Sequence, residues 1–236
     1  MPRRKRSMAI PGIYHITHRC HNKEFLLKFG KYRDLYLDKL LEMIRRYPVA
    51  VLNYMVTSNH VHLLVSVKNP NALSAGLHYL HGQVARKYNY LKKREGAFWS
   101  NRFYSTLIQD GEYFGHCLFY IDMNMVRAGV VEHPGEWQHT AWHEYMGNKK
   151  YKLIVNFPRL LNALMINDME HFREWYEKTL AAKLTGIMQH RKLYWSRSRA
   201  VGGQEWLARI TGKDLNLNIY QNSESEPFYL NFSKIE

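Results

Sequence analysis

Two apolar runs separated by three turn-forming residues constrain the fold of this 236-residue chain more than any other feature. The first run extends from Val49 to Val56 and the second from His62 to Val67, with Thr57-Ser58-Asn59 between them. Runs of this length that are rich in β-branched residues and joined by a short polar link are typical of a β-hairpin. The sequence therefore predicts two adjacent antiparallel strands.

Strands and helices are expected to alternate on both sides of this hairpin. Before it, Ile13–His18 has the composition of a strand, whereas Lys31–Arg46 repeats Leu and Ile at helical spacing. For His15, in the first strand, the simplest interpretation is a side chain that faces solvent. After the hairpin, the predicted elements are a helix over Asn71–Lys93, a strand over Arg102–Ile108 and a helix from Gly111 to Val126.

The resulting order, βαββαβ followed by one more helix, predicts an α+β fold. It is the order of the ferredoxin-like sandwich, in which four strands and two helices bury a single core. The added helix carries Tyr120.

The pattern changes after Gly147, where Asn148-Lys149-Lys150 forms a polar break. We expect a basic arm over residues 1–10, a main domain over 11–147 and a mainly helical C-terminal extension over 148–236. The extension shows no strand alternation, and its end, from Asn216 to Glu236, is expected to be loosely ordered. Its predicted helices are Phe157–Leu164, Met169–Lys183 and Gly203–Ile210.

Charge indicates the class of partner. Thirty-four Lys and Arg residues against twenty Asp and Glu give a formal net charge of +14, which is typical of a protein that meets phosphate backbones. The alternatives are a merely basic soluble protein and one that touches anionic lipid. The chain shows no membrane span and no signal peptide, and Cys20 and Cys117 lack zinc or disulfide spacing, so a cytoplasmic location is expected.

The hairpin contains two histidines that are candidate metal ligands. His60 and His62 stand two residues apart at the start of an apolar run, and the period of a strand places both side chains on one face. Neutral imidazoles bind divalent ions, although His-x-His also occurs often as two ordinary histidines. A metal site and two structural histidines both remain open from this motif alone.

Tyr120 and Asn124 are the second candidate pair. They lie four residues apart in a predicted helix, so both project from the same face. The alternative is a tyrosine that packs its ring in the core beside an asparagine that makes a local hydrogen bond.

Three blocks in this order resemble the REP-associated tyrosine transposases, a branch of the HUH single-tyrosine transposases. Residues 13–19 (IYHITHR) resemble the first strand of that family, residues 59–65 (NHVHLLV) its HUH strand, and residues 120–129 (YIDMNMVRAG) its tyrosine helix. Residues 99–103 (WSNRF) resemble a further block of the family. These blocks lie within residues 10–147, and their agreement in order, spacing and expected fold is what makes the resemblance specific.

The resemblance implies a metal-dependent enzyme that cleaves and rejoins single-stranded DNA. Tyr120 is the expected nucleophile, which leaves a 5′-phosphotyrosine link, and His60, His62 and Asn124 are the expected ligands of Mg²⁺ or Mn²⁺. A phenol is a poor nucleophile at its free pKa near ~10, so a Lewis acid beside the phosphate would assist the attack. Two imidazoles by themselves favour later transition metals, which leaves the choice of ion open.

The expected substrate is single-stranded DNA next to short palindromic repeats that fold into hairpins. Basic residues would contact its phosphates. Residues 190–199 mix cations and aromatics, which fits either a DNA clamp or a loop that packs Trp195 on the core. The candidate DNA-contacting residues are Arg3, Arg4, Lys5, Arg6, Arg86, Lys87, Lys92, Lys93, Arg94, Arg102, Arg191, Lys192, Arg197 and Arg199.

The chain departs from the family pattern at one place. Met125 stands where the family usually has a proline, and we expect the helix to continue through this position. Two other functions stay open: a catalytically inactive protein that binds hairpin DNA or RNA, and a metal hydrolase that uses water. The sequence is compatible with a monomer or a homodimer.

Overall fold

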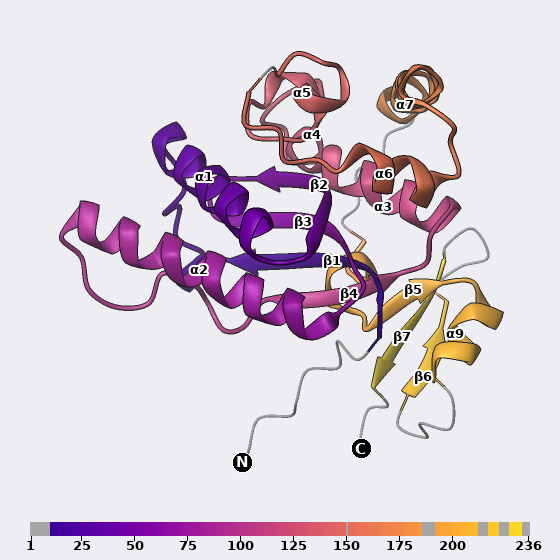
Figure 1. The fold of residues 1–236 in the computed structure, drawn as a ribbon, viewed down its shortest axis with the longest axis horizontal. Coiled ribbons are helices and arrows are strands. Elements are labelled where there is room, and N and C mark those ends of the chain that lie inside the picture. Colours follow the sequence, from indigo (N-terminus) through magenta and orange to yellow (C-terminus); the bar gives the residue numbers. More distant parts are fainter. Residues whose placement is uncertain (1–9, 150, 186–191, 212–216, 222–226, 233–236) are drawn as a thin grey trace.

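A computed structural model describes residues 10–149, 151–185, 192–211, 217–221 and 227–232. In the N-terminal half, the elements follow the predicted order, and most bounds agree within two residues (Figure 1). They are β1 (Gly12–Arg19), α1 (Gly30–Arg46), β2 (Val49–Val56), β3 (His60–Val67), α2 (Pro70–Lys92), β4 (Tyr104–Ile108), α3 (Glu112–Asp122) and α4 (Asn124–Arg127), with a 3-10 turn at His21–Lys23.

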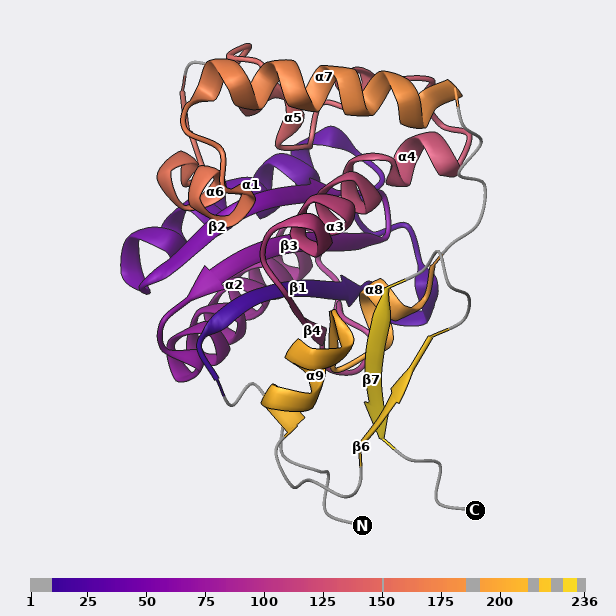
Figure 2. The ribbon, with the colours of Figure 1, turned by 90° about the vertical axis from the view of Figure 1, so that its right-hand side faces the viewer.

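The first four strands form the sheet that the sequence predicts. Their order is β2-β3-β1-β4, and each neighbouring pair is antiparallel. α1 and α2 lie side by side on one face of the sheet, whereas α3 lies on the other face (Figure 2). The α+β, ferredoxin-like class is therefore confirmed.

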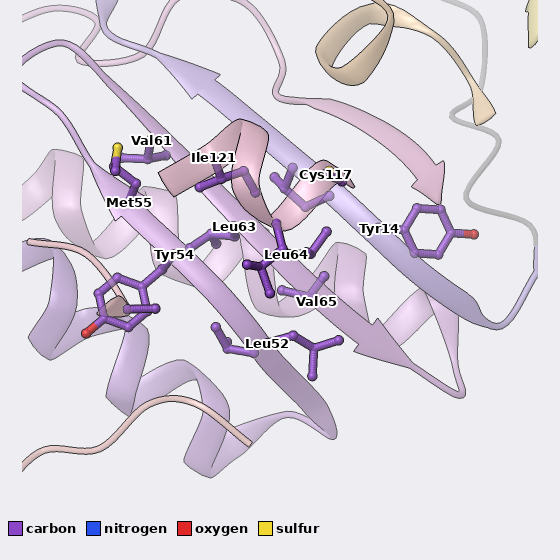
Figure 3. Close-up of a cluster of buried hydrophobic side chains, with 14 of the residues drawn as sticks. Tyr14, Leu52, Tyr54, Met55, Val61, Leu63, Leu64, Val65, Cys117 and Ile121 are labelled. Atoms are coloured by element: carbon purple, nitrogen blue, oxygen red, sulfur yellow. The ribbon is translucent and has the colours of Figure 1, made fainter. Parts of the chain in front are cut away.

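The core between the sheet and α3 is apolar, as a buried interface requires. Cys117 and Ile121 of α3 point toward Leu64 of β3 (Figure 3), and all three side chains are fully buried. A polar anchor fixes the helix on the sheet, because Asn53 donates hydrogen bonds to the Leu118 carbonyl and to the Asp122 carboxylate, at 3.3 and 3.0 Å. This packing sets the position of α3 over β2 and β3.

The C-terminal part is mainly helical, as expected. A 3-10 turn at Pro134–Glu136 leads into it, and α6 matches its predicted bounds. The helices are α5 (Trp142–Tyr145), α6 (Phe157–Leu164), α7 (Met169–Thr185), α8 (Tyr194–Arg197) and α9 (Gln204–Thr211).

The sequence did not predict the three short strands of this part, two of which lie in the end that was expected to be loosely ordered. β5 (Ala200–Gly202) pairs in parallel with β4, and β7 (Phe228–Phe232) and β6 (Leu217–Tyr220) continue the sheet, which has seven strands among the described residues. Strands of three to five residues are too short to show an alternating pattern. The sheet thus runs from the main domain into the extension, and the boundary near residue 148 stays a prediction.

The predicted single helix from Gly111 to Val126 is also wrong. α3 ends at Asp122, Met123 has φ −77° and ψ 3°, and α4 starts at Asn124. Arg127 donates a hydrogen bond to the carbonyl oxygen of Tyr120 at 2.8 Å. In a continuous helix, this oxygen would accept from the backbone N–H of Asn124. The helix therefore breaks next to Asn124 although Met125 is not a proline.

Both cysteines are free and buried. In the described ranges, none of the helices combines the length and the apolar character needed to cross a membrane.

Candidate active site

The two histidines of β3 lie on the sheet face that α3 covers. Their ring centroids are 4.9 Å apart. The loop before β3 holds His60, because its Nδ1 lies 2.7 Å from Asn59 Oδ1 and 2.9 Å from Thr57 Oγ1. Asn59 donates its own amide group to the Lys23 carbonyl, which leaves Oδ1 to accept from the imidazole. His60 therefore carries its proton on Nδ1 and keeps the lone pair on Nε2.

His62 is held by a chain of hydrogen bonds that starts in the C-terminal part. The Trp195 carbonyl contacts His15 Nδ1, and His15 Nε2 lies 2.8 Å from His62 Nδ1. A carbonyl can only accept, so a neutral His15 carries its proton on Nδ1 and accepts at Nε2 from His62 Nδ1. The lone pair of His62 is then on Nε2, as in a metal-binding histidine whose other nitrogen donates to a neighbouring group.

His15 is fully buried, so the expectation that it faces solvent is wrong. Burial lowers the pKa of His15 to about 4, and the hydrogen bond to Trp195 opposes this effect only in part. The imidazole is therefore neutral near pH 7, as the proton arrangement above requires. Trp195 itself is buried, which favours the core-packing interpretation of this segment over an exposed aromatic clamp.

The helix break brings Tyr120 and Asn124 to the same histidines. Tyr120 is 4% exposed, and its ring centroid lies 6.3 Å from that of His62. Asn124 Nδ2 lies 3.3 Å from His62 Nε2, so the amide faces the nitrogen that keeps its lone pair. Arg127 lies over the Tyr120 ring, with the guanidinium carbon 4.4 Å from the centroid.

These side chains border one small cavity of about 190 Å³. Among the described residues, no group of three or more His, Cys, Asp and Glu side chains is arranged to hold a metal ion. A ligand set at this site would therefore combine the two imidazoles with an amide, a donor that divalent ions accept. The cavity is lined by Arg19, His60, His62, Tyr120, Asn124, Arg127 and Ala128.

The structure brings together only part of the predicted DNA-contacting set. Arg102 and Arg197 are exposed and lie beside the histidine pair. Arg94 instead bonds to Asn89 and to the Ala97 carbonyl, as a structural residue does. The predicted contacts on α2 lie on the opposite face of the sheet, where Arg86, Lys87, Lys92 and Lys93 are exposed.

The other predicted DNA-contacting residues are either partly buried or outside the described residues. Lys192 and Arg199 are partly buried. Arg3, Arg4, Lys5, Arg6 and Arg191 lie outside the described residues.

Three residues of the site were not singled out from the sequence. His15, Thr17 and Arg19 stand at every second position of β1, which places their side chains on one face. Only the pairing of β1 with β3 shows that this face lies beside the histidines. Arg127 stands in the tyrosine block, where nothing local indicates that it turns back toward Tyr120.

Comparison with known proteins relates part of the chain to transposases. The family model for IS200-like transposases matches residues 11–124. A REP-associated tyrosine transposase of Haemophilus influenzae is 26% identical over 152 residues, which cover 59% of this chain and 84% of that protein. The residues that the family model matches include His60, His62, Tyr120 and Asn124.

Solved structures resemble the same part of the fold. A REP-associated tyrosine transposase bound to a REP hairpin has a TM-score of 0.53 and 18% identity, over 62% of this chain and 86% of that one. A transposase of Deinococcus radiodurans is 14% identical over 62% of this chain and 96% of that one, with a TM-score of 0.35 that is too low to inform the fold. Residues 11–124 of the chain are thus similar to the IS200-like transposases, and the solved REP-associated tyrosine transposase shares their fold.

Proposed function

We propose that this protein cleaves and rejoins single-stranded DNA through a covalent bond between Tyr120 and a phosphate. The observation that carries the proposal is the convergence of Tyr120 and Asn124 with His60 and His62 on one cavity. A protein that only binds DNA has no need of a phenol beside two imidazoles that keep their Nε2 lone pairs.

The reaction is a transesterification. Tyr120 Oη attacks the phosphorus, the bond from phosphorus to the 3′ oxygen breaks, and the phenolic proton leaves while that oxygen takes up a proton. The products are a 5′-phosphotyrosine and a free 3′-hydroxyl, and attack by a 3′-hydroxyl reverses the step and rejoins DNA. Arg19 and Arg127 line the cavity and offer positive charge to the phosphate oxygens.

A divalent ion, Mg²⁺ or Mn²⁺, fits the donors that are present. His60 and His62 would bind it through Nε2, and Asn124 would contribute its amide oxygen after a half-turn of the amide plane, which exchanges Oδ1 with Nδ2. When bound, the ion would supply a Lewis acid for the phosphate. The chain itself positions the ligands, through Asn59 for His60 and through His15 for His62.

Hairpin-forming DNA is the proposed substrate. The structural relative is bound to a REP hairpin, and this chain has the charge of +14 that a polyanionic partner requires. The break before Asn124 also supports an active enzyme, because this amide reaches His62 without the proline that the family usually has.

A cleavage assay tests the function. The substrate is a pool of labelled DNA hairpins with randomised single-stranded flanks, incubated with Mn²⁺. We expect cleavage by the wild-type protein, none by Tyr120→Phe, and wild-type cleavage by the matched control Tyr113→Phe on the same helix. Cleavage that persists in Tyr120→Phe would indicate a water nucleophile, and hairpin binding without any cleavage would indicate a binding module; either result rules out the proposal.

A further inference from the structure

A second cavity adjoins the first at the histidines. Its volume is about 170 Å³, and it shares Arg19, His60 and His62 with the first cavity, so these three side chains form a common wall. Tyr120 and Asn124 border only the first cavity. The second cavity is lined by Thr17, His18, Arg19, Lys23, His60, His62, Ser100, Asn101, Arg102, Tyr104, Ser196 and Arg197.

The second cavity has the chemistry of a nucleotide site. Four of its lining residues are cationic and none is acidic, so it favours an anion. Tyr104 is 55% exposed, and an exposed aromatic ring can stack on any base. Ser100, Asn101 and Ser196 add groups that can hydrogen-bond to a sugar or a base edge.

The C-terminal part builds one wall of this cavity. Ser196 and Arg197 belong to α8, beyond the residues that the family model matches. The turn after α8 is fixed to β4, because Thr106 donates to the Ser198 carbonyl at 2.7 Å and the Leu107 amide donates to the Arg199 carbonyl at 2.8 Å. The wall is therefore held in place by the sheet in the absence of DNA.

We propose that the second cavity binds the nucleotide on the leaving-group side of the scissile phosphate. This inference rests on the proposed function. In-line displacement places the attacking and leaving oxygens on opposite sides of phosphorus. With Tyr120 in the first cavity and the phosphate beside the histidines, the leaving strand runs toward the second cavity. For a 5′-phosphotyrosine product, this is the nucleotide that keeps the 3′-hydroxyl.

The contacts within this cavity follow from its lining. Tyr104 stacks on the base of the leaving nucleotide, and Arg102 and Arg197 bind the phosphate on its 5′ side. Because these contacts sit next to the reacting atoms, the cavity aligns the 3′ oxygen and also selects the base at this position. The C-terminal part thereby takes part in choosing the cleavage site.

Photocrosslinking tests the polarity directly. The probe is an oligonucleotide selected from the randomised pool because the wild-type protein cleaves it. It carries 4-thiothymidine as the first nucleotide on either the 5′ side or the 3′ side of the cleavage site. It is bound to Tyr120→Phe, which leaves the strand intact. We expect the 5′ probe to crosslink to peptides that contain residues 100–104 or 196–197, and the 3′ probe to crosslink elsewhere. The reverse pattern, or binding with no crosslink to these peptides, overturns the inference.

Variants separate the inference from the proposed function. Because a stacked base contributes about 1–3 kcal/mol, Tyr104→Ala should slow formation of the covalent adduct by about 5- to 140-fold. A substrate without the base on the leaving nucleotide should slow adduct formation by the wild-type protein as much as Tyr104→Ala does. The same substrate should not slow adduct formation by Tyr104→Ala any further. Arg45→Ala, an exposed cation on α1, is the matched control for Arg102→Ala and Arg197→Ala. Equal rates for all of these variants would overturn the inference, whereas failure of the wild-type protein to form an adduct would overturn the proposed function.

Discussion

The imidazole of His15 connects two parts of the chain that are 180 residues apart in sequence, from the Trp195 carbonyl to His62. In the proposed site, its role is to hold the proton of His62 on Nδ1, so that Nε2 faces Asn124. Groups that orient a metal-binding histidine in this way typically contribute about 10- to 100-fold to metal affinity.

Replacing His15 tests this positioning role. His15→Phe keeps an aromatic ring in the core but removes both hydrogen bonds, so we expect Mn²⁺ to bind about 10- to 100-fold more weakly. Calorimetric titration of the DNA-free protein measures the affinity, with His78→Phe on the exposed side of α2 as the control. An affinity equal to that of the wild-type protein would rule out the role.

Asp122 gives stability a pH dependence. Burial raises its pKa to about 7 from the usual 3.8, although hydrogen bonds from Tyr176 and Asn53 oppose the shift. The folded protein therefore holds this proton more tightly than the unfolded chain, so the stabilising contribution is complete below about pH 4 and is lost as the pH rises to about 7.

Asp122→Asn should remove this dependence, because an amide does not titrate. Relative to the wild-type protein, the free energy of unfolding of the variant should fall less between pH 4 and pH 7, and the two slopes should agree above pH 7. Urea denaturation across this range measures both. Parallel curves for the two proteins would show that Asp122 has no raised pKa.

The sequence predicted the candidate site only as far as local patterns extend. His60, His62, Tyr120 and Asn124 each follow from strand or helix spacing together with the family resemblance. The burial of His15 does not, because it depends on α8 covering β1, a contact that no local period encodes. Whether these four residues form the catalytic site remains a prediction, which the proposed experiments address.

At the scale of elements, the break between α3 and α4 has the clearest consequence. The Arg127 guanidinium donates a hydrogen bond to the Tyr120 carbonyl oxygen and lies over the Tyr120 ring. One side chain therefore both ends the helix and borders the cavity. The predicted continuous helix was wrong for this reason, since the sequence shows neither a proline nor a glycine at the break.

Arg127→Met should therefore lower stability and reshape the site. A hydrogen bond from a charged donor and a cation–π contact are lost, so we expect a decrease of about 1–3 kcal/mol in the free energy of unfolding. The freed carbonyl can accept from the Asn124 amide, which should then exchange its hydrogen more slowly. Unchanged exchange at Asn124 would show that Arg127 does not determine the break.

The helices and strands with long, regular patterns were predicted well. α1, α2 and α6 follow directly from apolar spacing, and in the structure the side chains of Asn69 and Asn156 cap α2 and α6. The short strands β5, β6 and β7 were missed, because their pairing with β4 and with each other, rather than their own composition, makes them strands.

At the level of the whole molecule, exposed cationic side chains lie on both faces of the sheet. Arg102 and Arg197 lie beside the histidines, while the cations of α2 lie on the opposite face. Two separate basic surfaces would suit a substrate with a reacting single strand and a structured hairpin.

The salt dependence of binding tests which cations contact the reacting strand. Each phosphate contact on single-stranded DNA adds about 0.7 to the slope of log affinity against log salt. Because both arginines bind the same phosphate, the double variant Arg102→Ala, Arg197→Ala should reduce the slope by about 0.7, measured by fluorescence anisotropy with a cleavable hairpin, whereas Arg45→Ala should not change it. A slope equal to that of the wild-type protein would mean that neither arginine binds a phosphate.

The most direct test of the central claim is to trap and map the covalent adduct. The wild-type protein is incubated with a hairpin substrate and Mn²⁺, denatured and digested, and the modified peptide is sequenced by mass spectrometry. We expect a nucleotide joined by its 5′-phosphate to Tyr120, and none in Tyr120→Phe. Cleaved DNA without any protein adduct, or an adduct on another residue, would contradict it.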